Sequence, residues 1–553
     1  MAATATRKQA LSTARRAIFG DVVALGTILA TSAVVVAFFL YRENAVVGRL
    51  GMPLDDAWIH FRVAENLATG NGFSFNPGEP TSASTSPAWT LLVALAYLVT
   101  GDFVVSAAAL GVLFYLATNA AVYFLARRIK PEPKIALAAG LLAAVTGRWV
   151  WASLSGMETT LFTALTVWGL LLWTGSPESR SWKSVAGAAL LGLSGLVRPE
   201  GFLLLCMVIA SAAPPLLARR RASLSEFART LARSRAAIPM AVLGGALLLR
   251  LAYTIGTGGG LAGNTFLAQS LPQGDSPYTG PRLIPDLWYL RSAVKSLQAD
   301  DFLLGLLIPL GMVYWIRLAV VEKGVRELSL LGLGWFVGLL AFNSVIAPNL
   351  RHHERYLMPL IPFAVLYGSF GIAFLVEHTV GERELLRVPR IERTVTATAL
   401  FGLVAAACLG DALIDARRWA TQYAGDVRSI ELINVRLGEW LRDHTPPDAY
   451  VAMNDIGAIA FISKRRVLDT VGIAEPGILP YLVEDSREGA FRYLQQRKPD
   501  YLVIWPEWYP EMAARRDIFE PVYSASVTDP LVATRDSMLG GREMVVYRAH
   551  WNH

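Results

Sequence analysis

Long apolar runs dominate this chain. Of its 553 residues, 54% are hydrophobic and only 17% are charged. A soluble multidomain protein of this length carries more charge, whereas runs of about 20 apolar residues are long enough to cross a lipid bilayer. The sequence therefore predicts a polytopic α-helical membrane protein.

The first apolar run, residues 18–41, follows a short basic segment. It lacks a small-residue cleavage site behind a short core, and it is longer than the roughly 7–15 apolar residues of a secretory signal. We therefore expect it to be retained as a membrane helix. Cys206 and Cys408 lie in separate apolar runs, so neither a disulfide framework nor a cysteine metal site is expected.

The apolar runs predict eleven membrane crossings. Residues 87–100 are apolar but short, and a run of this length is typical of a re-entrant or interfacial helix. With the N-terminus inside, the basic residues of every short loop then face the cytoplasm, including the arginine-rich segment 218–235, as the positive-inside rule requires. Orientation in the membrane thus accounts for the formal charge of +7, and no nucleic-acid partner is expected. The expected crossings are 18–41, 103–125, 135–151, 156–174, 184–197, 200–217, 236–254, 301–318, 327–346, 355–376 and 394–413.

This topology gives a membrane domain, residues 1–415, whose outer loop, residues 42–102, carries an acidic pair. Asp55 and Asp56 precede a predicted helix over residues 57–68. Charge beside a bilayer is costly and usually functional. The alternative is that the aspartates only cap this helix, because Asp favours the N-cap position.

Further polar residues fall on the same outer face, and we expect them to line one cavity with the acidic pair. Two alternatives stay open: Arg198 and Glu200 could only neutralise each other in a tight turn, and His352 and His353 could bind a metal ion. Adjacent helical residues point about 100° apart, so snorkelling or contact with phosphate at a helix start is favoured for the histidines. The expected cavity residues are His60, Arg62, Glu158, Arg198, Glu200, Asn264, Arg351, His352, His353, Glu354, Arg355 and Tyr356.

Residues 416–553 predict a small α/β domain on the extracytoplasmic side of the membrane. Short apolar segments indicate strands, and segments with apolar residues at helical spacing indicate helices between them. The expected strands are 449–453, 466–469, 501–505 and 543–547, and the expected helices are 429–443 and 487–496.

Two features of this domain bear on ligands. The turn 454–459 resembles the start of a nucleotide-binding turn, but it lacks the second and third glycines of the fingerprint, so no nucleotide cofactor is expected. The aromatic residues Trp505, Trp508 and Tyr509 could stack on sugar rings, or they could belong to an ordinary core or a membrane surface.

An acidic pair, nearby cations and a lipid-facing cavity fit a transferase that uses a lipid-phosphate donor. A carboxylate can take the proton of an acceptor hydroxyl, while Arg or His holds the leaving phosphate. No nucleotide donor is available on the outer face. A divalent ion that bridges Asp55 and Asp56 stays open. The expected phosphate contacts are Arg198, Arg351, His352, His353 and Arg355.

Ordered sequence blocks carry a resemblance to a known family. The membrane part of the chain resembles the polyprenyl-phosphate-sugar-dependent glycosyltransferases of the GT-C superfamily, and within it the mycobacterial terminal β-arabinofuranosyltransferase and its bacterial relatives. The matching blocks are Leu54–Arg62, Asn66–Glu79, Thr85–Thr90, Arg198–Gly201, Asn264–Phe266 and Glu354–Pro359.

The resemblance implies an inverting single displacement in which Asp55 is the general base, Asp56 supports it and an isoprenoid phosphate leaves. It also implies a multi-pass enzyme of the bacterial plasma membrane that serves cell-envelope biogenesis, with its active site outside the cytoplasm. The donor would be a polyprenyl-phosphate sugar, for which the resemblance suggests arabinofuranose. The acceptor would be a hydroxyl group of a glycan, lipid or protein, and the residues do not say which.

Two rival interpretations remain. A flippase or transporter of lipid-linked sugars would also expose charges to a cavity, but such proteins more often show paired, interrupted helices at the bilayer midplane. A non-catalytic subunit for assembly of envelope polymers is the second rival. The polar residues of this chain gather at one interface, which favours a surface enzyme.

Overall fold

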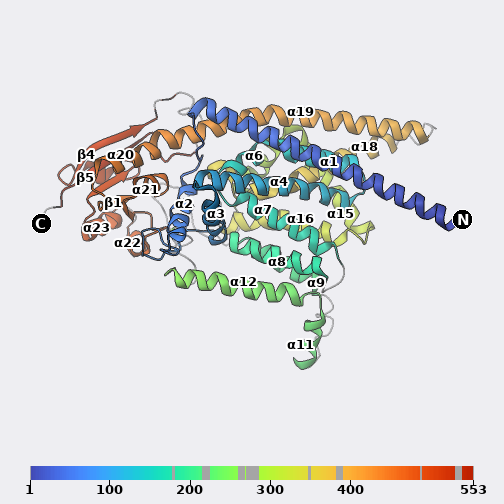
Figure 1. Ribbon diagram of the computed structural model, residues 1–553, viewed down its shortest axis with the longest axis horizontal. Helices are drawn as coiled ribbons and strands as arrows, with labels where there is room; N and C mark the ends of the chain where they lie inside the picture. Colours follow the sequence, from blue (N-terminus) through green and yellow to red (C-terminus); the bar gives the residue numbers. More distant parts are fainter. Residues whose placement is uncertain are drawn as a thin grey trace.

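The computed structural model describes residues 2–176, 181–213, 224–259, 268, 286–346, 350–381, 390–485, 488–527, 529 and 538–551. They form a long helical bundle with a small α/β domain at one end (Figure 1). The helices of the bundle are α1 (Ala2–Val47), α2 (Asp55–Ala68), α3 (Pro87–Thr100), α4 (Phe103–Ile129), α5 (Pro133–Val145), α6 (Gly147–Leu154), α7 (Thr159–Thr174), α8 (Trp182–Val197), α9 (Gly201–Ala212), α11 (Leu224–Arg233), α12 (Ala237–Gly256), α14 (Leu287–Ala299), α15 (Phe302–Val321), α16 (Arg326–Ile346), α17 (Arg351–Glu354), η1 (Met358–Leu360), α18 (Ile361–Gly381) and α19 (Arg390–Ile430).

Within the described ranges, seven helices are long and apolar enough to cross a membrane, and these involve α1, α4, α12, α15, α16, α18 and α19. The pair α5 and α6, bent by 57°, makes an eighth if it forms one span. α3, α7, α8 and α9 are apolar but shorter; the 16 residues of α7 reach only about 24 Å, against a hydrocarbon core of about 30 Å. The predicted multi-pass helical membrane protein is confirmed, and each expected crossing overlaps one of these helices. The number of eleven crossings stays a prediction.

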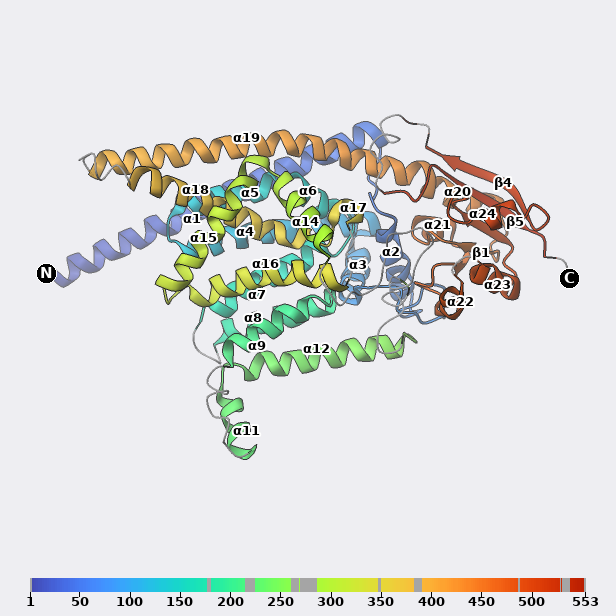
Figure 2. The ribbon, with the colours of Figure 1, turned by 180° about the vertical axis from the view of Figure 1, so that it is seen from behind.

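Basic residues at helix ends lie at one end of the bundle. Figures 1 and 2 place the N-terminus at the end away from the α/β domain. Near that end, Arg127 lies 3.1 Å from Asp21, and Arg235 lies 2.7 Å from Glu327. The basic helix ends therefore gather opposite to the end that carries α2 and the acidic pair.

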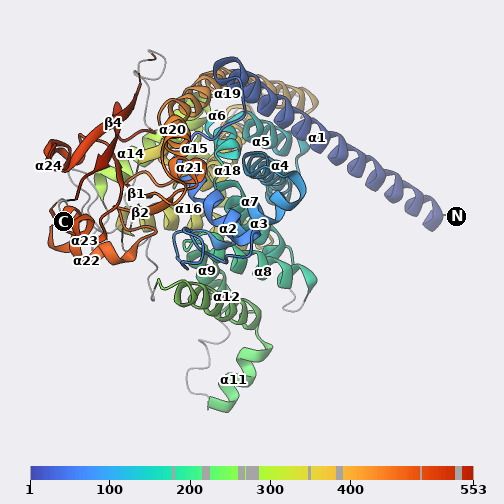
Figure 3. The same ribbon diagram turned by 60° about the vertical axis from the view of Figure 1, so that its left-hand side comes forward.

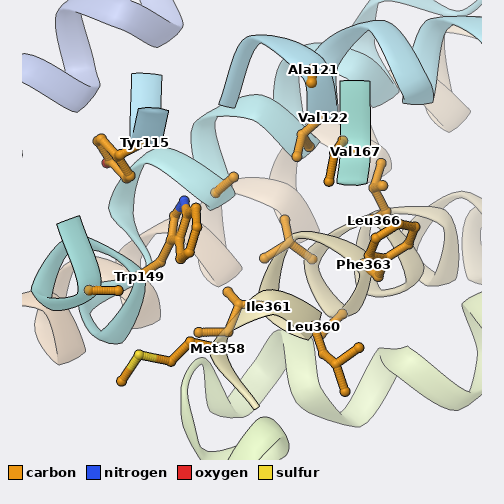
Figure 4. Packing of buried hydrophobic residues seen from close by; sticks show 14 of the residues in the cluster. Tyr115, Ala121, Val122, Trp149, Val167, Met358, Leu360, Ile361, Phe363 and Leu366 are labelled. Carbon is orange, nitrogen blue, oxygen red and sulfur yellow. The ribbon is translucent and has the colours of Figure 1, made fainter. Parts of the chain in front are cut away.

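A segment between α16 and α18 is anchored in the core of the bundle. Met358, Leu360 and Ile361 are almost completely buried, and Figure 4 shows Met358 and Ile361 beside Trp149 of α6. Between helices of a membrane bundle, such side chains stabilise the fold through close van der Waals packing. This packing holds the preceding residues, including Arg355, at a fixed place in the bundle.

The α/β domain contains a five-stranded mixed sheet in the order β2-β1-β3-β5-β4. β1 is parallel to β2 and β3, whereas β5 is antiparallel to both β3 and β4. Figure 3 shows α21 on the side of the sheet that faces α2. The elements of the domain are α20 (Arg436–His444), β1 (Tyr450–Met453), α21 (Ala458–Ser463), β2 (Arg466–Asp469), η4 (Pro476–Ile478), α22 (Leu479–Glu484), α23 (Glu488–Arg497), β3 (Tyr501–Ile504), α24 (Pro510–Ala514), β4 (Phe519–Ser526) and β5 (Glu543–Ala549).

The sequence located four of these strands and both expected helices, and three features differ from the expectation. A fifth strand, β4, was missed because Pro521 lies in it, beside a bulge in its pairing with β5. The helix expected at 429–443 is not separate: α19 continues through a π-helical turn, η3 (Glu431–Val435), into α20. Trp505 is fully buried in the domain core, so it has no exposed face on which a sugar could stack.

Candidate active site

The acidic pair forms the first turn of α2. Negative charge is favourable there because the helix dipole is positive at its N-terminus. The N-cap residue is Leu54, and no side chain caps the helix. The capping interpretation is therefore wrong for both aspartates, and their side chains take different directions: Asp55 contacts the α/β domain and Asp56 contacts the bundle.

Asp56 pairs with an arginine from far along the chain. Arg355 Nη2 lies 2.7 Å from Asp56 Oδ2, and the Asp56 side chain keeps 35% of its surface exposed. Burial acts to raise the pKa of Asp56, but the charges of Arg355 and His352 outweigh it and lower the pKa below its ordinary value. Asp56 is therefore an ionised carboxylate that a ligand can reach.

Arg355 belongs to a network that crosses the bundle. It donates to the Tyr356 hydroxyl at 3.2 Å, and Arg198 lies over the Tyr356 ring at 4.8 Å. Arg198 pairs with Glu200 at 2.8 Å and lies 3.7 Å from Glu158. Arg198 and Glu200 thus neutralise each other as the tight-turn alternative expected, yet they also join the cluster around Asp56.

His60 joins this network from α2. Its Nε2 lies 3.8 Å from Glu158 Oε2, and its Nδ1 lies 3.0 Å from the Thr90 hydroxyl and 3.2 Å from the Ser84 hydroxyl. Burial lowers the pKa of His60, so the imidazole is neutral at neutral pH. A neutral imidazole among hydroxyls can hydrogen-bond a polar ligand without adding charge.

Several buried atoms of the network lack a hydrogen-bond partner among the described residues. Such an atom costs about 1–3 kcal/mol, and native structures retain few of them. Three of the atoms are nitrogens and two are carboxylate oxygens, which suits a ligand that carries both anionic oxygens and hydroxyl groups. They are Arg355 Nη1, Arg198 Nη1, His352 Nδ1, Glu158 Oε2 and Glu200 Oε2.

Asp55 is held by the α/β domain. Its Oδ1 accepts hydrogen bonds from the Ala458 backbone N–H at 2.8 Å and from Asn434 Nδ2 at 3.1 Å, and its Oδ2 accepts one from the Gly457 N–H at 2.8 Å. Burial and the charge of Asp455 raise the pKa of Asp55, while the two backbone N–H groups oppose them. Both carboxylate oxygens of Asp55 thus accept hydrogen bonds from the protein.

The segment before Arg355 is a left-handed turn and not the expected helix start. His352, His353 and Glu354 have φ angles of 53°, 57° and 49°, a region that costs non-glycine residues about 1–3 kcal/mol each. The turn sends consecutive side chains to different partners. His353 Nε2 lies 2.8 Å from Asp426, and Glu354 lies 2.9 Å from Arg148, so neither joins the network around Asp56.

Of the remaining expected cavity residues, Arg62 lies outside this network. Arg62 donates to the carbonyl of Phe75 at 3.1 Å, which fixes the fold of the outer loop. Arg351 is exposed at the start of the turn. Asn264 lies outside the described residues.

The sequence analysis missed two groups of polar residues. Arg148 is buried within an apolar segment and pairs with Asp300 at 2.5 Å; a charge inside an apolar run was a usable signal. Asp426 accepts hydrogen bonds from Trp151 at 2.9 Å and from Gln422 at 2.7 Å. No local sequence pattern predicts these contacts. In the part of the chain that the structure describes, no group of three or more His, Cys, Asp or Glu residues could hold a metal ion.

The arrangement of the whole chain matches solved membrane proteins. ArnT from Cupriavidus metallidurans superposes with a TM-score of 0.58 over 95% of this chain and 98% of its own, at 13% identity. The same protein bound to undecaprenyl phosphate gives a TM-score of 0.57, with 94% and 98% coverage at 14% identity. The chain has the GT-C fold. A further GT-C protein, the oligosaccharyltransferase of Archaeoglobus fulgidus, matches with a TM-score of 0.51 over 95% of this chain and 74% of its own, at 12% identity.

Sequence comparison adds two partial matches to this GT-C chain. The terminal β-(1→2)-arabinofuranosyltransferase of Mycobacterium tuberculosis is 33% identical over 178 residues, which are 28% of each protein. The chain thus matches less than a third of the length of that curated relative. Residues 420–547 match a family described as a domain of unknown function, DUF8728. The resemblance seen in the sequence is confirmed at the level of the fold.

Proposed function

We propose that this GT-C chain is a glycosyltransferase that moves a sugar from a polyprenyl-phosphate donor to an acceptor hydroxyl. The observation that carries the proposal is the network in which ionised Asp56 pairs with Arg355, while Arg198 joins through the Tyr356 ring. Each of the two arginines has a buried nitrogen atom with no described hydrogen-bond partner. Arginine is suited to phosphate because its planar fork donates several hydrogen bonds. The ArnT complex with undecaprenyl phosphate supports a lipid donor for a protein of this fold.

In this proposal Asp56 is the general base. It is ionised and exposed on one side, whereas both oxygens of Asp55 already accept hydrogen bonds from the α/β domain. The base must lie within hydrogen-bond reach of the proton that it removes, and Asp56 meets this condition better. The contacts therefore favour Asp56 over Asp55, the residue that the family resemblance implied.

The chemistry then balances as a single displacement. Asp56 takes the proton of the acceptor hydroxyl while the oxygen of that hydroxyl forms a bond to the anomeric carbon. The bond from that carbon to the phosphate oxygen breaks, and Arg355 and Arg198 hold the phosphate that leaves. This step inverts the anomeric carbon; retention, seen by NMR of the product, would instead require a covalent intermediate on a carboxylate.

Neither aspartate offers an unoccupied pair of oxygens to a metal, because Arg355 holds Asp56 and three N–H donors hold Asp55. The proposal therefore uses no metal ion. A chelator added to the purified enzyme should leave turnover unchanged. Loss of turnover that Mg²⁺ or Mn²⁺ restores would show that a cation displaces Arg355 from Asp56.

In this proposal the site lies on the extracytoplasmic side of the bacterial plasma membrane. The basic helix ends lie at the opposite end of the bundle from Asp56, and basic residues favour the cytoplasmic side. The test labels single cysteines in a background without Cys206 and Cys408. Glu226→Cys on α11 should resist a membrane-impermeant thiol reagent in intact cells, and Glu484→Cys on α22 should react; the reverse would invert the orientation.

The functional test is transfer by the purified protein in lipid vesicles. The proposal expects a new glycosidic bond from a polyprenyl-phosphate sugar, with arabinofuranose as the first sugar to try because of the partial match to an arabinofuranosyltransferase. Nucleotide sugars should give none. Movement of the lipid-linked sugar across the vesicle membrane without formation of a glycosidic bond would indicate a flippase. Binding of glycan with neither activity would indicate an assembly subunit.

A further inference from the structure

We infer that the α/β domain positions the catalytic loop of the bundle. In this arrangement the Asp55 side chain occupies the binding edge of the domain, the edge of its sheet where an α/β domain usually binds a ligand. The domain belongs to a family described only as a domain of unknown function. The contacts stand by themselves, while the consequence for turnover rests on the proposed function.

The topology of the sheet identifies the binding edge. β1 lies between β2 and β3 and runs parallel to both. The chain passes from β1 to β2 on one side and then to β3 on the other, so the carboxyl end of β1 is a topological switch point. Open α/β sheets bind their ligands at this position. The turn 454–457 follows β1 there, and Trp505 follows β3.

The carboxylate of Asp55 occupies this position. It caps the N-terminus of α21, where the Gly457 and Ala458 N–H groups each donate at 2.8 Å. Such N–H groups are suited to an anion. A nucleotide phosphate would need the same donors, so the absence of the remaining fingerprint glycines agrees with a carboxylate as the ligand.

Gly457 permits this close approach. A Cβ atom there would lie 2.0 Å from the Asp55 carbonyl oxygen and 2.5 Å from its Oδ2. Its φ of −78° is ordinary, but its ψ of −98° lies outside the regions that other residues favour, so both space and backbone conformation favour glycine here. Gly425 of α19 is a matched control, because a Cβ there would have no atom within 4 Å.

Side chains of the domain complete the pocket around Asp55. Asn434, almost fully buried, donates to Asp55 at 3.1 Å and lies 3.5 Å from Asp455. Trp505 Nε1 donates to Asp455 at 3.0 Å. Asn434 and the turn 457–458 therefore hold the Asp55 carboxylate, and Trp505 holds the neighbouring Asp455.

The rest of α2 and its loop is also fixed to the domain. Lys464 lies 2.6 Å from Glu65, and Asn76 pairs with the edge of β2, accepting from the Val467 N–H and donating to its carbonyl, both at 2.9 Å. Ile59 and Val63 share a hydrophobic cluster with the sheet. Since Asp56 is the residue next to Asp55, this docking sets where Asp56 meets Arg355.

The first test follows the contact itself by hydrogen exchange of the full-length protein in detergent. The Gly457 and Ala458 amides should exchange slowly in the wild type. Exchange should become much faster in Asp55→Asn and in Gly457→Ala, and it should stay slow in Gly425→Ala. Unchanged protection in both Asp55→Asn and Gly457→Ala would overturn the inference. This measurement needs no activity, so it is independent of the proposed function.

The second test separates a positioning role for Asp55 from a catalytic one. Asp55→Asn should lower kcat by roughly tenfold or more, because small misplacement of a reacting group is costly, with the donor KM nearly unchanged. Joining Glu65→Cys to Lys464→Cys with a short bis-maleimide should restore most of kcat in Asp55→Asn, and should leave kcat of an otherwise wild-type protein unchanged. An Asp55→Asn variant that is tethered and still inactive would overturn the positioning role.

Discussion

Arg355 Nη2 lies 2.7 Å from Asp56 Oδ2 and joins the loop before α18 to the first turn of α2. Arg355 is only 8% exposed, and its Nη1 has no described hydrogen-bond partner. The Nη2 atom is thus held by the carboxylate, and the Nη1 atom stays available to a ligand. In the proposed reaction, the pair places the general base beside a group that binds the leaving phosphate.

Replacement of Asp56 by asparagine should remove the base and keep the shape. We expect kcat to fall by roughly 10²–10⁴-fold, the range typical of a lost general base. The thermal midpoint should also fall, because the buried Arg355 loses its anionic partner. Glu79→Gln is the control, because Glu79 is an exposed loop carboxylate that pairs with Arg466. Near-normal turnover of Asp56→Asn would exclude Asp56 as the base.

The pH dependence of kcat distinguishes the two aspartates. The pKa of Asp56 lies below its ordinary value of 3.8, since Arg355 and His352 outweigh burial, so Asp56 stays ionised as the pH falls. The value of kcat should therefore stay nearly constant from about pH 8 down to about pH 5, because the base does not become protonated in this range. Burial raises the pKa of Asp55, so a base at Asp55 would give a kcat that falls at a clearly higher pH.

Arg355 should control use of the donor. Charge-assisted hydrogen bonds contribute about 1.5–3 kcal/mol, so Arg355→Ala should raise the donor KM or lower donor kcat/KM by roughly 10–100-fold. Arg355→Lys keeps the charge but loses the planar guanidinium, so its loss of donor kcat/KM should be intermediate. Arg466→Ala is the control, because Arg466 is 56% exposed and pairs with Glu79 at the surface. A change confined to the acceptor KM would place the phosphate elsewhere.

Much of the fold could be predicted because the signals were local. The apolar runs gave the bundle helices, and short apolar segments such as residues 450–453 gave strands. The pairing of Asp55 with Gly457 could not be predicted, because no spacing rule links residues so far apart in sequence. The left-handed turn at His352 had only a weak signal: histidine is enriched at positive φ relative to most residues, but this conformation is still uncommon for any residue except glycine.

The acidic pair shows how far residue type alone leads. The sequence identified both aspartates and most of the network around Asp56, since charges beside a membrane are conspicuous. It could not assign their separate roles, because these depend on which partners the fold presents to each side chain. The buried ion pair of Arg148 and Asp300 shows the same limit for residues that stabilise the site.

Arg148 should matter for stability rather than for chemistry. It pairs with Asp300 at 2.5 Å and with Glu354 at 2.9 Å, and its side chain is 1% exposed. Arg148→Met would leave Asp300 buried without its cation, which typically costs about 3–5 kcal/mol. Thermal unfolding in detergent should show this loss, and adding Asp300→Leu should restore much of it. An unchanged midpoint in Arg148→Met would contradict the structural role.

The most direct test of the account counts both products of one reaction by the purified wild-type protein. With a polyprenyl-phosphate sugar and an acceptor, we predict one molecule of polyprenyl phosphate released for each glycosidic bond formed, and no release without the acceptor. Release without bond formation, or bond formation from a donor that carries no lipid phosphate, would contradict it.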